Sequence, residues 1–289
     1  MKPFLNKKII IYSVKVIIGC GLLYYLFLQR KINFGFFTHK NTFLLVQLFI
    51  LQLIMFAVGT LRWQTIGVGA YKMSMGFLTT AYISWVGQFF ESFFPSTIGT
   101  DVTRIYYASK KSNLPKSDLI KITIIDRVSA FLVVVLCSVL GLVFYLSHLG
   151  LLISVLSGII LLVLLKFFLK RTLGQVLLRK GFHVPPFSVI VLSAVNFMLK
   201  AFSLFLIIYL TAGKGDRGDY YLCLAYQSVE AIAILPVNIG LGHILFDKAL
   251  AFVKIINGAQ LYNIYFTVKI LFKATGFAGW LVIRAQQKL

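Results

Sequence analysis

Acidic residues are scarce in this chain. The 289 residues contain eight Asp and Glu against 29 Lys and Arg, which gives a formal net charge of +21. Only 13% of the residues are charged, whereas 59% are hydrophobic. This composition excludes an ordinary soluble domain, and several apolar runs reach the ~20 residues that a helix needs to cross a bilayer. We therefore expect an all-α polytopic integral membrane protein.

Cysteine is scarce as well. Cys20, Cys137 and Cys223 all lie in apolar stretches and show no CxxC spacing, so neither a disulfide framework nor a cysteine metal site is indicated. His243 has no second histidine at ligand spacing, which favours a polar lining or packing role over a metal. We expect no metal and no cofactor.

Signatures of soluble enzymes are missing. The sequence has no GxSxG elbow, Walker loop, HExxH helix or dinucleotide fingerprint, and no polar segment long enough for a catalytic domain. These absences disfavour an enzyme. Membrane glycosyltransferases can use one or two carboxylates near the interface, so a transferase is kept as an alternative.

The excess of positive charge is distributed over the segments between apolar runs, without an RNA- or DNA-binding motif. We expect no nucleic-acid partner, since membrane topology and anionic headgroups explain the charge. With the N-terminus inside, most of the basic loops fall on the cytoplasmic side. This places both termini in the cytoplasm of a prokaryotic cytoplasmic membrane protein.

The apolar runs divide the chain into about six full spans and two broken segments. The expected spans are 9–28, 43–61, 122–146, 149–169, 187–211 and 264–283. A tight turn at Ser147 and His148 separates the third from the fourth. In the broken segments, 76–110 and 220–254, an apolar arm runs into Pro and Gly, and the pattern favours two re-entrant hairpins.

The two halves of the chain repeat this order. Ile9 corresponds to Leu149, Phe43 to Phe187, Pro95 to Pro236 and Ile122 to Ile264, with offsets of 140 to 144 residues. Each half would have three full spans, an odd number, so the second copy would insert upside down. We therefore expect one membrane domain over residues 1–289, built from inverted repeats of approximately 1–146 and 147–289.

Matched helix breaks in two such halves point to a substrate site near the bilayer midplane. After the first break, Ser96 or Thr100 would cap a short helix whose N-terminal amides suit a phosphate. Arg127 would offer a forked set of donors to a phosphate or to Glu91. The candidate substrate-binding residues are Glu91, Ser96, Thr97, Gly99, Asp101, Arg104, Asp126, Arg127, Glu230, Asn238, Gly240, Gly242 and His243.

A structural interpretation of the same charges competes with the functional one. Asp101 and Arg104 lie three residues apart on one helix face, and Asp126 precedes Arg127 directly. These two pairs would hold the first hairpin in place rather than bind a ligand. Both interpretations stay open at this point.

The stretches Leu61–Trp63, Gly87–Arg104 and Asp126–Arg127, with Leu235–Leu250 in the second half, resemble the lysylphosphatidylglycerol synthase transmembrane (flippase-like) family. The resemblance implies a fold of inverted repeats that moves an amphipathic lipid between leaflets. The chain ends at Leu289 without the aminoacyltransferase domain of the bifunctional members, so we expect a standalone member without the synthase activity.

Three positions depart from the family pattern. Thr100 replaces a second glycine, Asp126 replaces a glutamate, and the sequence from His243 to Leu245 lacks an acid that usually follows the second glycine loop. The missing acid bears on the substrate and on any coupling to protons.

The function that we expect is translocation of an anionic or modified phospholipid, or of a polyprenyl-phosphate-linked glycan, across the cytoplasmic membrane. The alternatives are a membrane-embedded glycosyl or aminoacyl transferase acting on a lipid phosphate, with Asp101 or Glu230 as base, and a non-transporting subunit of an envelope-glycan assembly complex. The partner is the membrane lipid or lipid-linked glycan. The pattern is also compatible with a lipid-modifying enzyme or glycosyltransferase as partner protein, and with an oligomer.

Overall fold

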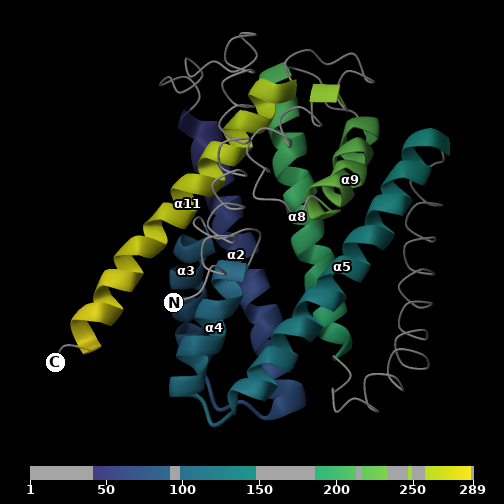
Figure 1. The fold of residues 1–289 in the computed structure, drawn as a ribbon. Coiled ribbons are helices and arrows are strands. Elements are labelled where there is room, and N and C mark those ends of the chain that lie inside the picture. The colour runs from purple at the N-terminus through teal and green to yellow at the C-terminus, as the bar shows by residue number, and fades with distance from the viewer. Residues whose placement is uncertain are drawn as a thin grey trace, which may run out of the picture.

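The computed structural model describes residues 42–91, 98–147, 186–212, 217–232, 247–248 and 258–287. These residues form helices joined by short connections, and they contain no strand (Figure 1). This confirms the all-α prediction for this part of the chain. The helices are α2 (Thr42–Tyr71), α3 (Phe77–Glu91), α4 (Ile98–Lys111), α5 (Lys116–Ser147), α8 (Phe187–Ala212), α9 (Arg217–Ile232) and α11 (Gly258–Gln287).

The outer faces of these helices are apolar. Phe43 and Leu78 are 71% and 81% exposed, and large hydrophobic side chains are exposed on α2, α4, α5, α8 and α11 as well. Helices that are hydrophobic on all sides suit a lipid environment. Among the described residues, α2 and the segment Phe187–Leu210 are long and apolar enough to cross a bilayer. The protein is therefore a helical membrane protein, and the number of spans stays a prediction.

One helix bound agrees with the predicted spans and another differs from them. α8 begins at Phe187, as expected. α2 continues to Tyr71, ten residues past its predicted end, because its polar residues find partners inside the protein: Arg62 binds Asp126, and Gln64 donates to the Met75 carbonyl. Spans 9–28 and 149–169, and the turn at His148, lie outside the described residues.

α5 begins earlier than its predicted span at 122. Pro115 immediately precedes its first residue, Lys116, and accepts bonds from the Asp118 and Leu119 amides through its carbonyl. A proline at a helix start removes no intrahelical bond, and an acid in the first turn favours this end of the helix. α5 ends at Ser147, beside the predicted turn.

The first broken segment contains two short helices. α3 has 15 residues and α4 has 14, so each is about 22 Å long, less than the ~30 Å of a bilayer core. The two pack against each other, and Gly99 makes this possible because a Cβ there would lie 2.6 Å from both the Glu91 nitrogen and the Phe90 oxygen. A re-entrant hairpin stays the predicted interpretation of this pair.

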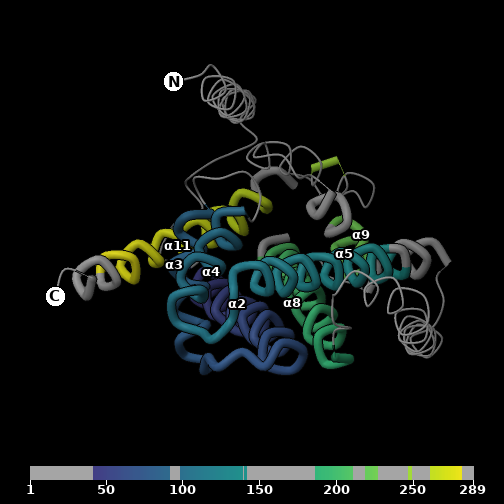
Figure 2. Tube along the Cα trace, turned by 60° about the horizontal axis from the view of Figure 1, so that its bottom comes forward, coloured from purple at the N-terminus to yellow at the C-terminus, as the bar shows by residue number. Residues whose placement is uncertain are grey.

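α2 and α8 pack against each other, and each of them also contacts α5 and α11 (Figures 1 and 2). α3 packs against α11, and α5 packs against α9. Both crossings use glycine: a Cβ on Gly276 would collide with the Trp85 carbonyl, and one on Gly141 would lie 2.8 Å from the Leu224 Cβ. Small residues of this kind let helix backbones approach closely inside a membrane.

The helix contacts follow a pattern of exchange. Replacing α2 by α8, α3 by α9 and α5 by α11, and the reverse, leaves the α2–α8 contact unchanged. It maps every other principal contact that does not involve α4 onto a different principal contact. Two related halves would produce this pattern. The inverted repeat itself stays a prediction, since the second break and its return arm lie outside the described residues.

Candidate functional site

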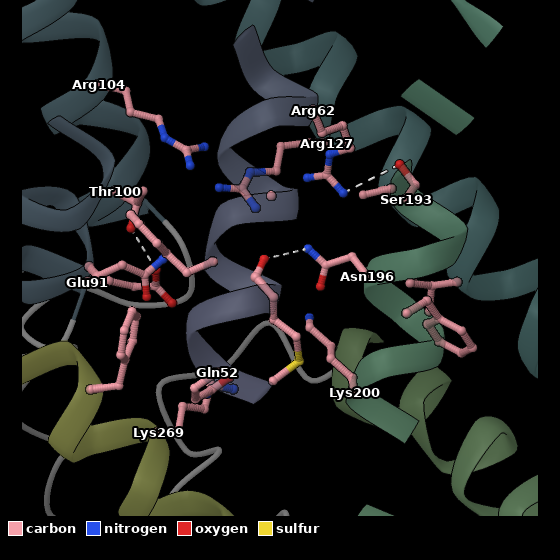
Figure 3. A pocket seen from close by; sticks show the side chains of 18 of the residues that line it. Gln52, Arg62, Glu91, Thr100, Arg104, Arg127, Ser193, Asn196, Lys200 and Lys269 are labelled. Atoms are coloured by element: carbon pink, nitrogen blue, oxygen red, sulfur yellow. Dashed lines mark hydrogen bonds between the residues drawn. The ribbon is translucent and has the colours of Figure 1, made fainter. Parts of the chain in front are cut away.

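A cavity of about 240 Å³ lies among α2, α3, α4, α5, α8 and α11 (Figure 3). Its charged lining consists of five basic side chains and one carboxylate: Arg62, Arg104, Arg127, Lys200, Lys269 and Glu91. In Figure 3 the three arginines gather at one end and the two lysines at the other. The lining thus contains more basic than acidic side chains, which favours a negatively charged ligand.

Arg62 and Asp126 form a two-bond ion pair at the arginine end. Nε lies 2.6 Å from Oδ1 and Nη2 lies 2.9 Å from Oδ2, and both residues are buried. Arg62 also donates to the Ser193 Oγ at 3.4 Å. The pair thus joins α2 to α5 and reaches α8. The expected pair of Asp126 with Arg127 is wrong, because neighbouring residues on a helix point in different directions.

Arg127 makes the second two-bond pair, with Asp101. Nε lies 3.0 Å from Oδ2, and Nη2 lies 2.5 Å from Oδ1. The pair joins α5 to α4, so the forked face of Arg127 is occupied by a carboxylate of the protein rather than by Glu91. The suggested pairing of Asp101 with Arg104 is also wrong. In both cases the acid is held across helices, not within one.

Arg104 differs from the other two arginines. Its Nε donates to the Ser84 Oγ at 2.9 Å, and its guanidinium carbon lies 5.7 Å from the centre of the Trp63 ring. Trp63 is itself fixed by a 3.3 Å bond from its Nε1 to the Thr123 Oγ1. Arg104 is only 6% exposed, yet within the described residues it forms no ion pair with a carboxylate. Its guanidinium group faces the cavity (Figure 3).

Glu91, the last residue of α3, connects this helix to α4 and α11. Its Oε2 accepts a 2.6 Å bond from the Thr100 Oγ1, and its Oε1 lies 3.0 Å from the Lys273 Nζ. Thr100, the residue that departs from the family glycine, lies within the first turn of α4 rather than capping it. Lys273 is absent from the predicted site, although it lies in an apolar run, where a charge needs a partner.

Other polar groups of the cavity come from α8. Lys200 carried the signal of a charge in an apolar span, whereas Ser193 and Asn196 carried no signal. Ser193, Asn196 and Lys200 follow one another at helical spacing and line the same wall. Gln52 and Gln88 complete the neutral polar lining. None of these five was predicted as a site residue, because the second hairpin rather than this span was expected to face the ligand.

Part of the predicted site cannot be compared with the structure. Ser96, Thr97, Asn238, Gly240, Gly242 and His243 lie outside the described residues, and so does the side chain of Glu230, which belongs to α9. In the part of the chain that is described, no group of three His, Cys, Asp or Glu is placed to hold a metal ion.

Comparison with known proteins adds one match. The family model of the lysylphosphatidylglycerol synthase TM region matches residues 12–266. No curated protein and no solved structure matches the chain. Because the matched segment covers most of the 289 residues, the chain belongs to the lysylphosphatidylglycerol synthase TM region family.

Proposed function

We propose that this protein moves an anionic or modified phospholipid, or a polyprenyl-phosphate-linked glycan, across the cytoplasmic membrane of a prokaryote. One observation carries the proposal: Arg104 is buried beside a cavity and, in the described part of the chain, has no carboxylate partner. Membership of a family named for the membrane region of a lipid synthase supports a lipid as the ligand.

Burying a charge in this cavity costs energy. A cation removed from water costs several kcal/mol, and a carboxylate or a bound anion must compensate for it. Asp126 and Asp101 do this for Arg62 and Arg127. Arg104 is left to a ligand, and its guanidinium group has the planar donors that bind a phosphate.

The two arginine–aspartate pairs then have a supporting role. Each pair is neutral as a whole, and together they fix α2, α4 and α5 around the cavity. A headgroup phosphate would be attracted chiefly by Arg104, because Asp126 and Asp101 offset the charges of Arg62 and Arg127. Acyl or prenyl chains would stay in the lipid, where the outer faces of the helices are apolar.

We further propose the membrane arrangement expected from the sequence: N- and C-termini in the cytoplasm, two re-entrant helix pairs, and inverted repeats. The short α3–α4 pair and the exchange of helix contacts support this arrangement. A lipid-modifying enzyme or a glycosyltransferase acting on the same lipid would be a natural partner protein.

A transferase on a lipid phosphate is the rival function. One of its two suggested bases, Asp101, is engaged by two bonds from Arg127 and is not among the described residues that line the cavity. The side chain of the other, Glu230, lies outside the described residues. Translocation therefore has the stronger support.

The test is a liposome assay with purified protein. Tagged anionic phospholipid, aminoacylated phospholipid and polyprenyl-phosphate glycan are each followed by their accessibility to a reagent outside the vesicle. Faster exposure of one lipid class without new covalent bonds is the expected result. A covalent product on mixing donor and acceptor, with no movement, would establish the transferase instead.

A further inference from the structure

Three exposed lysines lie at the end of the molecule where α2 and α4 stop (Figure 1). Lys72 follows α2, Lys111 ends α4, and Lys116 begins α5. Asn113 joins the two connections that carry them. Its Oδ1 accepts bonds from the Ser74 amide and hydroxyl at 2.9 and 3.0 Å, and its Nδ2 donates to the Lys72 carbonyl at 3.3 Å. Lys72 is thereby held beside the turn between the other two lysines, and we call the three residues the lysine surface.

No neighbouring acid offsets the charge of the lysine surface. Among the described residues, no carboxylate forms an ion pair with any of its three members. Asp118, close to Lys116 in sequence, binds Lys121 at 3.2 Å. Lys110 does not belong to the surface, because its ammonium group turns back over the Tyr106 ring and bonds to the Tyr106 hydroxyl. The lysine surface therefore presents three positive charges to its surroundings.

Lys72 has a backbone conformation that suits glycine better. Its φ is 56°, the one positive φ among the described residues other than glycine. Glycine usually takes the left-handed position after a helix, since a Cβ there costs energy. Packing does not account for the lysine, because its side chain is exposed while the next residue, Met73, is buried. Two explanations remain: the charge interacts with the C-terminal end of α2, or it binds a ligand.

Three helices relate the depth of the lysine surface to that of the cavity. Counted along α2, α4 and α5 at about 1.5 Å per residue, the lysines lie roughly 10–16 Å from the arginines that line the cavity. Half of a bilayer's hydrocarbon core is about 15 Å thick. With the cavity near the bilayer midplane, as we expect from the sequence, the lysines reach the headgroups of one leaflet.

Apolar side chains beside the lysines distinguish a lipid from a soluble anion. Val68 lies one helical turn before Lys72 and is 43% exposed. Ile120 lies one turn after Lys116, on the same helix face, and is 45% exposed. A ligand that contacts both the lysines and these side chains has an anionic group next to an apolar part. A phospholipid has this structure, and inorganic phosphate does not.

We propose that the lysine surface binds the phosphates of anionic phospholipids in the leaflet that it faces, at a site separate from the cavity. The ammonium groups contact the phosphates, and the acyl chains lie along the exposed apolar side chains of α2 and α5. The site holds anionic lipid beside the protein whether or not the protein moves it. This inference therefore goes beyond the proposed translocation.

The test measures which lipids gather beside the lysine surface. A fluorophore is attached to Ser117→Cys, an exposed position next to Lys116, and the protein is placed in phosphatidylcholine vesicles. Either phosphatidylglycerol or phosphatidylcholine with a nitroxide on the same acyl carbon is then added as quencher. We expect nitroxide phosphatidylglycerol to quench as if it were about fivefold more concentrated near the fluorophore, which is about what one lysine contributes at an anionic membrane surface.

Two matched variants assign this excess to the three charges. The combined substitution Lys72→Gln, Lys111→Gln, Lys116→Gln should reduce the excess to about twofold or less, as should salt at about 1 M. Arginine at the same three positions keeps the charge and should keep the excess. Protein with the native Ser117 corrects for label on the native cysteines. If the triple glutamine variant fails to fold, the three single variants replace it, and each should give a smaller reduction.

Two substitutions of Lys72 separate its two possible roles. Lys72→Ala removes the charge and keeps the left-handed residue, so we expect an unfolding temperature close to that of the wild type and a smaller quenching excess. Lys72→Gly also removes the strain and should unfold at a higher temperature with the same smaller excess. A less stable Lys72→Ala protein with an unchanged excess would assign the charge to the end of α2 and contradict its place in the lipid site.

The quenching experiment is independent of lipid movement. Equal quenching by the two nitroxide lipids, or an excess that the triple glutamine variant retains in full, would overturn the inference and leave translocation untouched. An excess that depends on the three lysines, in a protein that moves no lipid, would support the inference and count against the proposed function.

Discussion

Lys273 Nζ lies 3.0 Å from Glu91 Oε1, and this ion pair joins α11 to the last residue of α3. The side chains are 15% and 11% exposed. Thr100 donates to the second oxygen of the same carboxylate from α4. One acid therefore ties the C-terminal helix to the short α3–α4 pair, at the wall of the cationic cavity.

Lys273→Met should destabilise the protein strongly, because it leaves the Glu91 carboxylate buried without its cation. Breaking a buried pair in this way costs about 3–5 kcal/mol. The double variant Glu91→Gln, Lys273→Met should recover much of this loss, since the stranded charge is gone. Thermal unfolding in detergent, followed by tryptophan fluorescence, measures both effects.

The control for this experiment is a pair at the surface. Lys121 and Asp118 form a 3.2 Å ion pair with side chains 32% and 29% exposed. Exposed pairs contribute about 0–1 kcal/mol, so Lys121→Met should have little effect. A Lys273→Met protein as stable as Lys121→Met would show that Glu91 does not depend on Lys273.

Arg62 and Arg104 should respond differently to the same substitution. Arg62→Gln strands Asp126, which is fully buried, and should reduce the free energy of unfolding by about 3–5 kcal/mol. Arg104→Gln strands no acid among the described residues and removes a buried charge, so stability should be unchanged or higher. Equal destabilisation of the two variants would mean that Arg104 has a structural role.

Arg127→Gln extends this comparison. The substitution removes the cation that binds Asp101 by two bonds, so a loss of activity would be accompanied by a loss of stability. Asp101 is partly exposed, which makes the expected loss smaller than for Arg62→Gln. A stable, folded Arg127→Gln protein without activity would instead assign Arg127 to the ligand.

The crossing of α11 and α3 depends on the absence of a side chain at Gly276. Gly276→Ala places a Cβ against the Trp85 carbonyl oxygen, and because that oxygen belongs to the backbone, the helices must separate. We expect a loss of about 1–3 kcal/mol, the usual cost of overpacking. Gly76→Ala is the control, since a Cβ there has no atom within 4 Å. Similar unfolding temperatures for the two variants would contradict the close crossing.

The sequence predicts the helices well and their polar partners poorly. Apolar length located α8, since burying a backbone in lipid requires a helix. Pro and Gly after an apolar arm located the break between α3 and α4. It ended α2 too early, because Arg62 and Gln64 read as the start of a loop. Their partners, Asp126 and the Met75 carbonyl, are brought near only by folding.

In the candidate site, too, the sequence indicated several of the residues but not their partners. Charges in apolar runs marked Glu91, Arg104 and Asp126 as residues in need of partners. Which partner each one takes depends on how helices cross, and local spacing suggested Arg127 for Asp126 where the structure has Arg62. Asn196 was not predicted, because a single amide in an apolar span does not indicate a site by itself. Only the folded structure shows that it lines the cavity.

The most direct test of the account is lipid movement by Arg104→Gln in liposomes that contain phosphatidylglycerol. The control is Lys110→Gln on the same helix, where the ammonium group is exposed and bonds to the Tyr106 hydroxyl. We expect the wild-type protein and Lys110→Gln to move the lipid, and Arg104→Gln to do so at least tenfold more slowly while remaining folded. Normal movement by Arg104→Gln would contradict the account.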